Sequence, residues 1–399
     1  MSPAATELLS VPPHLTRFDH RRWVLQCPSG HQLLLNEAGA ELLQLVAQAP
    51  SFLEGCARFN VKYATCLTPA EFEQLVQRQF GGYRLLANEQ QAQRPAAASP
   101  IRFRVQLLSA RWAGRLAAPL AVLCSPAIFW PLLAALGAGL AIGYLVAPPA
   151  TWLPGGTDLV GVFYLSILVH ELGHIAACRR AGLAHGSVGV GFYLLLPVFY
   201  ADVTAIWQGT RHQRIIANLA GIFTQLLYAA AVAGVGLLLH APAWLLSAQA
   251  IALLALWQLN PFVRHDGYWL LADLTNTPNL LDEARRVRQR VLSPQLLPAL
   301  RAGTLAELIG PANAWLLVYG LLNSAVVFCF MALLLWRAGP GILQLPRLLD
   351  TLLSKLLAGT LTKQDFTSNT LTVLAFYGVL IRWLISYSTL ALTRWRKAR

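Results

Sequence analysis

Charged residues are scarce in this sequence: Asp, Glu, Lys and Arg together make up 12% of its 399 residues, whereas hydrophobic residues make up 56%. A soluble protein of this length has about twice that charged fraction. Several stretches of about 18 residues or more have little or no charge. A helix needs about this length to cross a membrane. The composition therefore argues against an ordinary soluble protein and predicts an integral membrane protein.

Cysteine is also sparse, with six residues and no CxxC pair. This absence argues against a disulfide framework and against a zinc site with cysteine ligands. The amino terminus lacks a basic start followed by an apolar stretch, so we expect no cleaved signal peptide. The formal net charge is +13, but no soluble segment has basic residues interleaved with aromatic ones. We therefore expect no nucleic-acid partner.

The long apolar runs predict about six transmembrane helices. They cover Pro119–Val146, Leu159–Arg179, Ile215–Leu239, Ala243–Leu259, Ala312–Trp336 and Leu371–Leu392. Arginine clusters lie in alternate connections, and the loops on the opposite side have no Lys or Arg. Because cytoplasmic loops collect basic residues, we expect both termini on the cytoplasmic side of a bacterial inner membrane.

Two further apolar segments are unlike ordinary spanning helices. Gly186–Trp207 is rich in glycine, valine and aromatic residues and has a proline near its middle, so we expect a re-entrant hairpin that enters the membrane against protein. Ile342–Leu357 places polar side chains between leucines at helical spacing. That periodicity predicts an amphipathic helix on the outer membrane surface.

The strongest chemical signal is His170-Glu171-Leu172-Gly173-His174, which lies inside an apolar run. On a helix, residues four positions apart share a face, so both imidazoles can bind one metal ion. Glu171 lies next to that face and can take a proton from a metal-bound water. Chance can also produce so short a motif, but ionisable side chains near the middle of a membrane are costly and tend to be kept for function.

A catalytic zinc usually has three protein ligands and one open position, so a third ligand must come from elsewhere. The candidate segment is Asn260–Gly267 (NPFVRHDG), at the end of the fourth expected span. With the HExxH segment it resembles the motif pair of the site-2 protease family of intramembrane metalloproteases, HExxH and a downstream N-P…D-G. The resemblance covers about Leu159 to Leu274. It implies zinc as the cofactor, Asp266 as the third ligand and Asn260 as a residue that positions the substrate or the transition state.

This sequence departs from the family pattern at His265, where the family usually has an apolar residue. Three interpretations are open for His265: a partner that hydrogen-bonds a ligand, an alternative metal ligand, or a histidine at the membrane interface. A second departure is Ala220-Gly221-Ile222, where relatives commonly have Ala-Gly-Pro; we expect it to alter the entry of a helix and not the metal site. The segment between the two motifs is too short for a PDZ domain.

The residues up to about Leu86 predict a small soluble α+β domain, with a hairpin, three helices and a short closing strand. Arg17–Gln26 alternates as a strand does, Asn36 can cap the first helix, and Ser51 and Thr68 begin two capping boxes. This order, with the segment LLLNEAGAELLQLV, resembles the PqqD-like domain, which holds leader peptides for enzymes that mature ribosomally made peptides. The resemblance implies that a leader adds as a strand to the hairpin edge. A generic winged helix or a scaffold without a ligand is the alternative.

The expected fold class is thus a multi-span α-helical membrane protein with a site-2-protease-like core and a re-entrant β-hairpin, plus a small winged-helix-like α+β domain at its amino terminus. We expect four regions along the chain. These are a peptide-recognition domain (1–87), a linker with a basic pre-membrane segment (88–117), the metalloprotease core (118–336), and a last region with the outer-face helix, a transmembrane helix and a basic tail (337–399).

The expected activity is peptide-bond hydrolysis by a membrane-embedded zinc endopeptidase, with Glu171 as the catalytic base. The amino-terminal domain favours the leader of a ribosomally made peptide as the substrate; membrane lipid and a transporter are the other expected partners. One alternative is regulated intramembrane proteolysis of a transmembrane protein such as an anti-sigma factor. Another is a non-proteolytic component of an export complex that only binds peptide, although the intact Glu171 argues against it.

Overall fold

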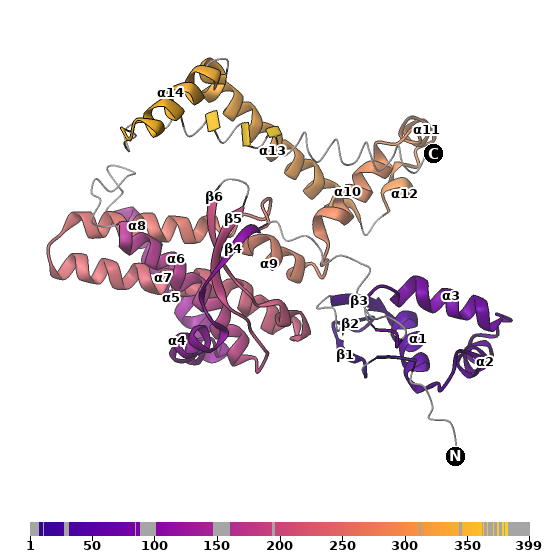
Figure 1. Ribbon diagram of the computed structural model, residues 1–399. Coiled ribbons are helices and arrows are strands. Elements are labelled where there is room, and N and C mark those ends of the chain that lie inside the picture. Colours follow the sequence, from indigo (N-terminus) through magenta and orange to yellow (C-terminus); the bar gives the residue numbers. More distant parts are fainter. Residues whose placement is uncertain are drawn as a thin grey trace. The chain divides into compact units, whose positions relative to one another are not determined.

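The computed structural model describes residues 8–10, 12–27, 32–83, 85–87, 101–146, 160–193, 196–310, 313–342, 345–360 and single residues or pairs between 362 and 381. Its contacts divide the chain into two compact units. The first unit contains the amino-terminal domain and the following helices up to residue 255, and the second contains residues 101–105, 189–200 and the chain from residue 256 onward. Helices predominate, as expected from the sequence (Figure 1).

The amino-terminal domain has the predicted order of a hairpin followed by three helices (Figure 1). Its elements are β1 (His14–Arg17), β2 (Arg22–Gln26), β3 (Gln32–Asn36), α1 (Glu37–Gln48), α2 (Phe52–Tyr63) and α3 (Pro69–Phe80). The sheet is antiparallel in the order β1-β2-β3. Leu25, Leu43 and Phe72 are fully buried in the core of this domain. The expected closing strand is reduced to an isolated bridge between Leu9 and Leu86.

The starts of the three helices follow the predicted capping residues. The side chains of Asn36 and Ser51 accept backbone N–H groups at the starts of α1 and α2. At the start of α3, Thr68 and Glu71 form a reciprocal capping box. Each cap satisfies a backbone donor that has no partner within the helix, which is why these short polar residues mark helix starts in a sequence.

The expected single strand over Arg17–Gln26 is wrong. The carboxylate of Asp19 accepts the backbone N–H groups of Arg21 and Arg22, and this turn separates β1 from β2. Aspartate favours such turns because its side chain hydrogen-bonds backbone donors nearby. The sequence did not reveal the turn because the segment has neither glycine nor proline.

The membrane part of the first unit is built from helices, with one short 3₁₀ helix. Its elements are α4 (Ala110–Leu123), α5 (Pro126–Val146), α6 (Val160–Arg180), η2 (Thr204–Gln208), α7 (Arg211–Leu238) and α8 (Pro242–Trp257). Among the described residues, α5, α6, α7 and, in the second unit, α13 (Ala314–Ile342) each contain a stretch long and apolar enough to cross a membrane. Helix α8 is apolar but shorter. Four of the expected spans are therefore present as candidate membrane helices.

The first expected span, Pro119–Val146, needs correction. The chain breaks between α4 and α5, where the carbonyl oxygen of Ser125 accepts the N–H groups of Ile128 and Phe129. Pro126 follows this break, and a proline disfavours helical backbone at the residue before it. Pro119 thus lies inside α4 and not in the candidate spanning helix. The sixth expected span, Leu371–Leu392, lies mostly outside the described residues.

Helices α6 and α7 run side by side and form the main packing contact of the membrane part (Figure 1). A Cβ added at Gly173 of α6 would overlap the hydroxyl of Thr224 and the carbonyl oxygen of Ala220 on α7. The Thr224 hydroxyl lies 3.1 Å from the carbonyl oxygen of Val169 on α6. Small residues and hydroxyl groups of this kind allow membrane helices to approach closely.

In the second unit, the predicted hairpin is present as β5 (Val188–Tyr193) and β6 (Leu196–Ala201), and its entry into the membrane stays a prediction. A strand that the sequence analysis did not predict, β4 (Ile101–Leu108), completes a sheet in the order β4-β5-β6. The helices of this unit are α9 (Asp266–Leu274), α10 (Leu280–Val291), α11 (Leu296–Ala302), α12 (Leu305–Ile309), α13 and α14 (Leu345–Leu357). Buried residues of α9, α10 and α13 share one apolar core.

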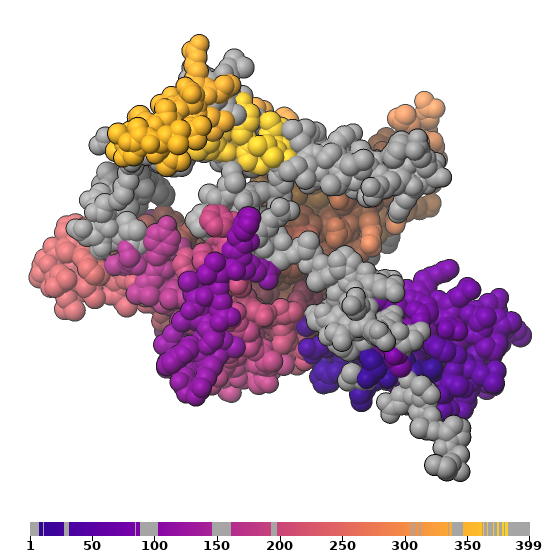
Figure 2. Space-filling model, in the orientation of Figure 1, coloured from indigo at the N-terminus to yellow at the C-terminus, as the bar shows by residue number. Residues whose placement is uncertain are grey.

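Helix α14 confirms the amphipathic helix predicted over Ile342–Leu357. Its side chains include the exposed leucines Leu349, Leu353 and Leu357, and it is coloured yellow-orange in Figures 1 and 2. Exposed leucines on a helix that also has polar residues suit a membrane surface. Its placement on the outer surface stays a prediction.

Candidate metal centre

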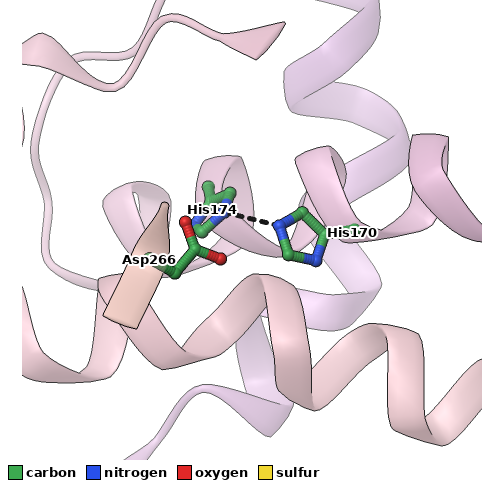
Figure 3. A group of neighbouring side chains, drawn as sticks. All are labelled: His170, His174 and Asp266. Atoms are coloured by element: carbon green, nitrogen blue, oxygen red, sulfur yellow. Dashed lines mark hydrogen bonds between the residues drawn. The ribbon is translucent and has the colours of Figure 1, made fainter. Parts of the chain in front are cut away.

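Two histidines lie one turn apart on α6, on the side that packs against α7. Their side chains are buried, with His170 3% and His174 8% exposed. Their Nε2 atoms are 3.2 Å apart. Figure 3 marks this contact with a dashed line between the two rings. The prediction that helical spacing brings both imidazoles to one point is confirmed.

Each imidazole is also held through its other ring nitrogen. Nδ1 of His174 is 2.8 Å from the carbonyl oxygen of Ala217, and Nδ1 of His170 is 3.1 Å from Oε1 of Gln225. A carbonyl oxygen only accepts hydrogen bonds, so Nδ1 of His174 is the donor, and Nε2 of the neutral ring keeps a lone pair. Histidine metal ligands are commonly oriented by a partner of this kind.

Asp266 is the aspartate of the N-P…D-G motif and the first residue of α9, and the loop that begins at Asn260 directly precedes it. The N–H of Gly267 donates to the carbonyl oxygen of Gln258 at 2.8 Å. A Cβ at Gly267 would overlap the carbonyl group of Leu259, so only glycine allows this close approach of the two backbone segments. The glycine of the motif therefore sets the position at which Asp266 begins α9.

His170, His174 and Asp266 each offer one ligand atom, and these atoms all lie within 4.8 Å of one another (Figure 3). His265, which the sequence left open as an alternative ligand, is not in this group of described residues. It precedes α9, and its carbonyl oxygen accepts the N–H of Tyr268. The geometry thus favours Asp266 over His265 as the third donor.

The space next to the two Nε2 atoms depends on Gly221 of α7. A Cβ at this position would lie 2.5 Å from Nε2 of His174 and 2.6 Å from Nε2 of His170. Two imidazole nitrogens and one carboxylate, with no side chain on the helix that faces them, form a donor set that fits a catalytic zinc ion. The expectation that Ala220-Gly221-Ile222 affects the entry of a helix and not the metal site is wrong, because these residues lie inside α7 and Gly221 faces both Nε2 atoms. A glycine in an apolar helix has no chemical signal of its own.

Two residues of α13 hold the loop that precedes α9. The Tyr319 hydroxyl donates to the carbonyl oxygen of Pro261 at 2.8 Å, and Nδ2 of Asn323 donates to that of Phe262 at 2.9 Å. Within the loop, Oδ1 of Asn260 accepts the N–H of Phe262 at 2.9 Å. Tyr319 and Asn323 were not predicted from the sequence, because they lie in an apolar run and match no motif spacing.

The two residues expected to take part in catalysis lie on the same two segments as the metal donors. Glu171 follows His170 on α6 and is half-buried, and Asn260 begins the motif loop and is also half-buried. Among the described residues, Glu171 is not in the group of potential metal donors. Their places are compatible with roles in substrate chemistry.

Comparisons with known proteins bear on this site. The model of peptidase family M50 matches residues 159–388, which is more than half of the chain and includes all three donors. A protein of Bacillus subtilis (strain 168) named "Putative peptide zinc metalloprotease protein YydH" is 28% identical over 116 residues, 28% of this chain and 46% of that protein. The chain thus aligns with less than half of that relative's length, and no solved structure matches it. The family match, which covers more than half of the chain and all three donors, shows that the chain belongs to peptidase family M50.

Proposed function

We propose that the protein is a membrane-embedded endopeptidase whose zinc is held by His170, His174 and Asp266. The observation that carries the proposal is the convergence of three donor atoms within 4.8 Å of one another. A zinc ion bound there would polarise the carbonyl group of a scissile peptide bond and lower the pKa of water towards about 7. Helix α6, which contributes both histidines, is itself a candidate membrane span.

Glu171 is the general base of this proposal. Its carboxylate takes a proton from the attacking water and later gives a proton to the leaving amine. Asn260 is the proposed substrate-positioning residue. Because its Oδ1 accepts the N–H of Phe262, its Nδ2 hydrogens are the groups that can donate to a substrate carbonyl.

The test of this mechanism separates the base from the metal ligands. We expect Glu171→Gln to lose about 10²- to 10⁴-fold in cleavage of fluorogenic peptides while it still binds one zinc ion, because the amide has the same shape but cannot take the proton. We expect His174→Ala to lose both zinc and cleavage. Wild-type cleavage rates in Glu171→Gln would contradict the mechanism.

The β4-β5-β6 sheet supplies a means of holding an extended substrate. Strand β6 lies at an edge of this sheet, and an edge strand can pair with an added peptide strand. A helical substrate must unwind before cleavage, because its backbone carbonyls are otherwise hydrogen-bonded within the helix. We infer that the β6 edge receives the substrate as a strand.

The substrate that best fits the whole chain is the leader of a ribosomally made peptide. The hairpin and three helices of the amino-terminal domain have the order of a PqqD-like leader-binding domain. The relative from Bacillus subtilis has "peptide zinc metalloprotease" in its name, which agrees with a peptide substrate. The alternative substrate is a transmembrane regulator such as an anti-sigma factor. Membership of a peptidase family and the intact Glu171 argue against a purely peptide-binding export component.

Deletion of Met1 to Leu86 distinguishes the two substrates. With a leader-bearing precursor peptide as the probe, we expect the truncated protein to retain zinc but to lose capture and cleavage of the precursor. A fluorogenic peptide without a leader should be cut equally by the truncated and full-length proteins. Unchanged cleavage of the precursor after the deletion would overturn capture of the leader by the amino-terminal domain.

A further inference from the structure

A chain of buried polar groups leads from α6 through α7 to the first histidine of the metal site. Ser166 of α6 is 0% exposed and Gln225 of α7 is 1% exposed. The Ser166 hydroxyl donates to the carbonyl oxygen of Phe163 at 2.7 Å. Nε2 of Gln225 donates to Oγ of Ser166 at 3.2 Å, and Oε1 of Gln225 lies 3.1 Å from Nδ1 of His170. Polar side chains this deeply buried are costly unless they are satisfied.

The directions of these hydrogen bonds follow from the first one. The single hydroxyl hydrogen of Ser166 is used on a backbone carbonyl, so Oγ can only accept from Gln225. The amide of Gln225 must therefore direct its NH₂ group to Ser166 and its oxygen to His170. An amide oxygen only accepts, so Nδ1 of His170 has the proton and Nε2 of the neutral ring has the lone pair.

The two histidines differ in what fixes them. Nδ1 of His174 donates to the backbone carbonyl of Ala217, which no substitution removes. Nδ1 of His170 depends on a side chain, Gln225, whose orientation depends in turn on Ser166. Only the His170 side of the site can therefore be altered at its supporting residues without a change to either ligand.

We propose that Gln225, oriented by Ser166, is a positioning residue that fixes the tautomer and the ring orientation of His170 for metal binding. This inference rests on the proposed metal site. Without the acceptor, the His170 ring can rotate or place its proton on Nε2, the atom that faces His174. Loss of such a supporting partner typically weakens metal binding by about 10- to 100-fold.

The test measures zinc affinity directly, by competition with a chromogenic chelator in detergent, alongside the visible spectrum of the cobalt-substituted protein. We expect Gln225→Leu to weaken zinc binding about 10- to 100-fold and to alter the cobalt spectrum. Gln225→Glu keeps an oxygen that accepts from Nδ1 and should retain most of the affinity. Ser166→Ala removes the group that orients the amide, so we expect a smaller loss of affinity.

Thr224→Val is the matched control. Thr224 is equally buried on α7, next to Gln225 in sequence, but its hydroxyl contacts backbone carbonyls and not a histidine. The Thr224→Val substitution should lower thermal stability, whereas zinc affinity and the cobalt spectrum should stay at wild-type values. A purely structural role for Gln225 would make its leucine variant behave like this control.

The outcomes separate the inference from the function on which it rests. Wild-type zinc affinity in Gln225→Leu, with zinc lost in His174→Ala, would overturn the positioning role and leave the metal site intact. Equal losses in Gln225→Leu and Gln225→Glu would also overturn it, because the accepting oxygen would then be irrelevant. A wild-type protein without zinc would overturn both the site and the inference.

Discussion

At the scale of single residues, functional side chains at a fixed sequence spacing could be predicted. Residues whose role depends on the packing of two helices could not. The pair His170 and His174 was predictable because helical geometry brings positions four apart to one face. Asp266 required the family resemblance, because no local spacing connects it with α6. The roles of Gly221 and Gln225 at the metal site were not identifiable from the sequence, because these roles arise only where α7 passes the histidines.

The role of Gly221 gives a sharp prediction. We expect Gly221→Ala to weaken zinc binding by about 10-fold or more, because its Cβ would lie 2.5 Å and 2.6 Å from the two Nε2 atoms. Alanine is otherwise the better helix former by about 1 kcal/mol, so helix formation by α7 is not at risk. Zinc content and the thermal unfolding temperature in detergent provide the check.

Gly234 of α7 is the control for this substitution, since a Cβ there meets nothing within 4 Å. Gly234→Ala should therefore bind zinc as the wild type does, with equal or higher thermal stability. Full zinc affinity in Gly221→Ala would show that the absence of a side chain at this position is unrelated to the metal.

At the scale of secondary structure, apolar length and capping residues determined which helices could be predicted. The runs that became α5, α6, α7 and α13 are long and nearly uncharged, and Asn36, Ser51 and Thr68 marked helix starts that the structure confirms. Strand β4 was missed because its pairing with β5 joins residues far apart in the sequence, and no local period encodes such a partner.

Loss of the packing between α6 and α7 should be most damaging to the stability of the fold and to zinc binding. We expect Gly173→Ala to lower the thermal unfolding temperature and the zinc content together, because its Cβ would overlap Thr224 and Ala220 and force the two helices apart. Overpacking of this kind typically costs about 1–3 kcal/mol. Gly161 lies on the same helix, and its Cβ would meet nothing within 4 Å. Gly161→Ala should therefore leave both quantities unchanged, and identical behaviour of the two variants would refute the packing argument.

At the scale of the whole molecule, hydropathy predicts that the chain crosses a membrane, and the distribution of arginines predicts in which direction. The first prediction agrees with four candidate spanning helices among the described residues. The second prediction is the direction in which the chain crosses the membrane. It matters for function, because a leader-binding domain can act only on the side where precursor peptides are made.

A native cysteine can report that orientation. Four of the six cysteines are buried, Cys66 is exposed in the amino-terminal domain, and Cys329 is exposed on the candidate spanning helix α13. A membrane-impermeant maleimide requires a thiol in water, so it should label Cys66 and not Cys329. If the amino-terminal domain is cytoplasmic, inverted membrane vesicles will be labelled and right-side-out vesicles will not, and Cys66→Ser will abolish the signal. Labelling of Cys66 in right-side-out vesicles would place the domain outside and rule out capture of a cytoplasmic leader.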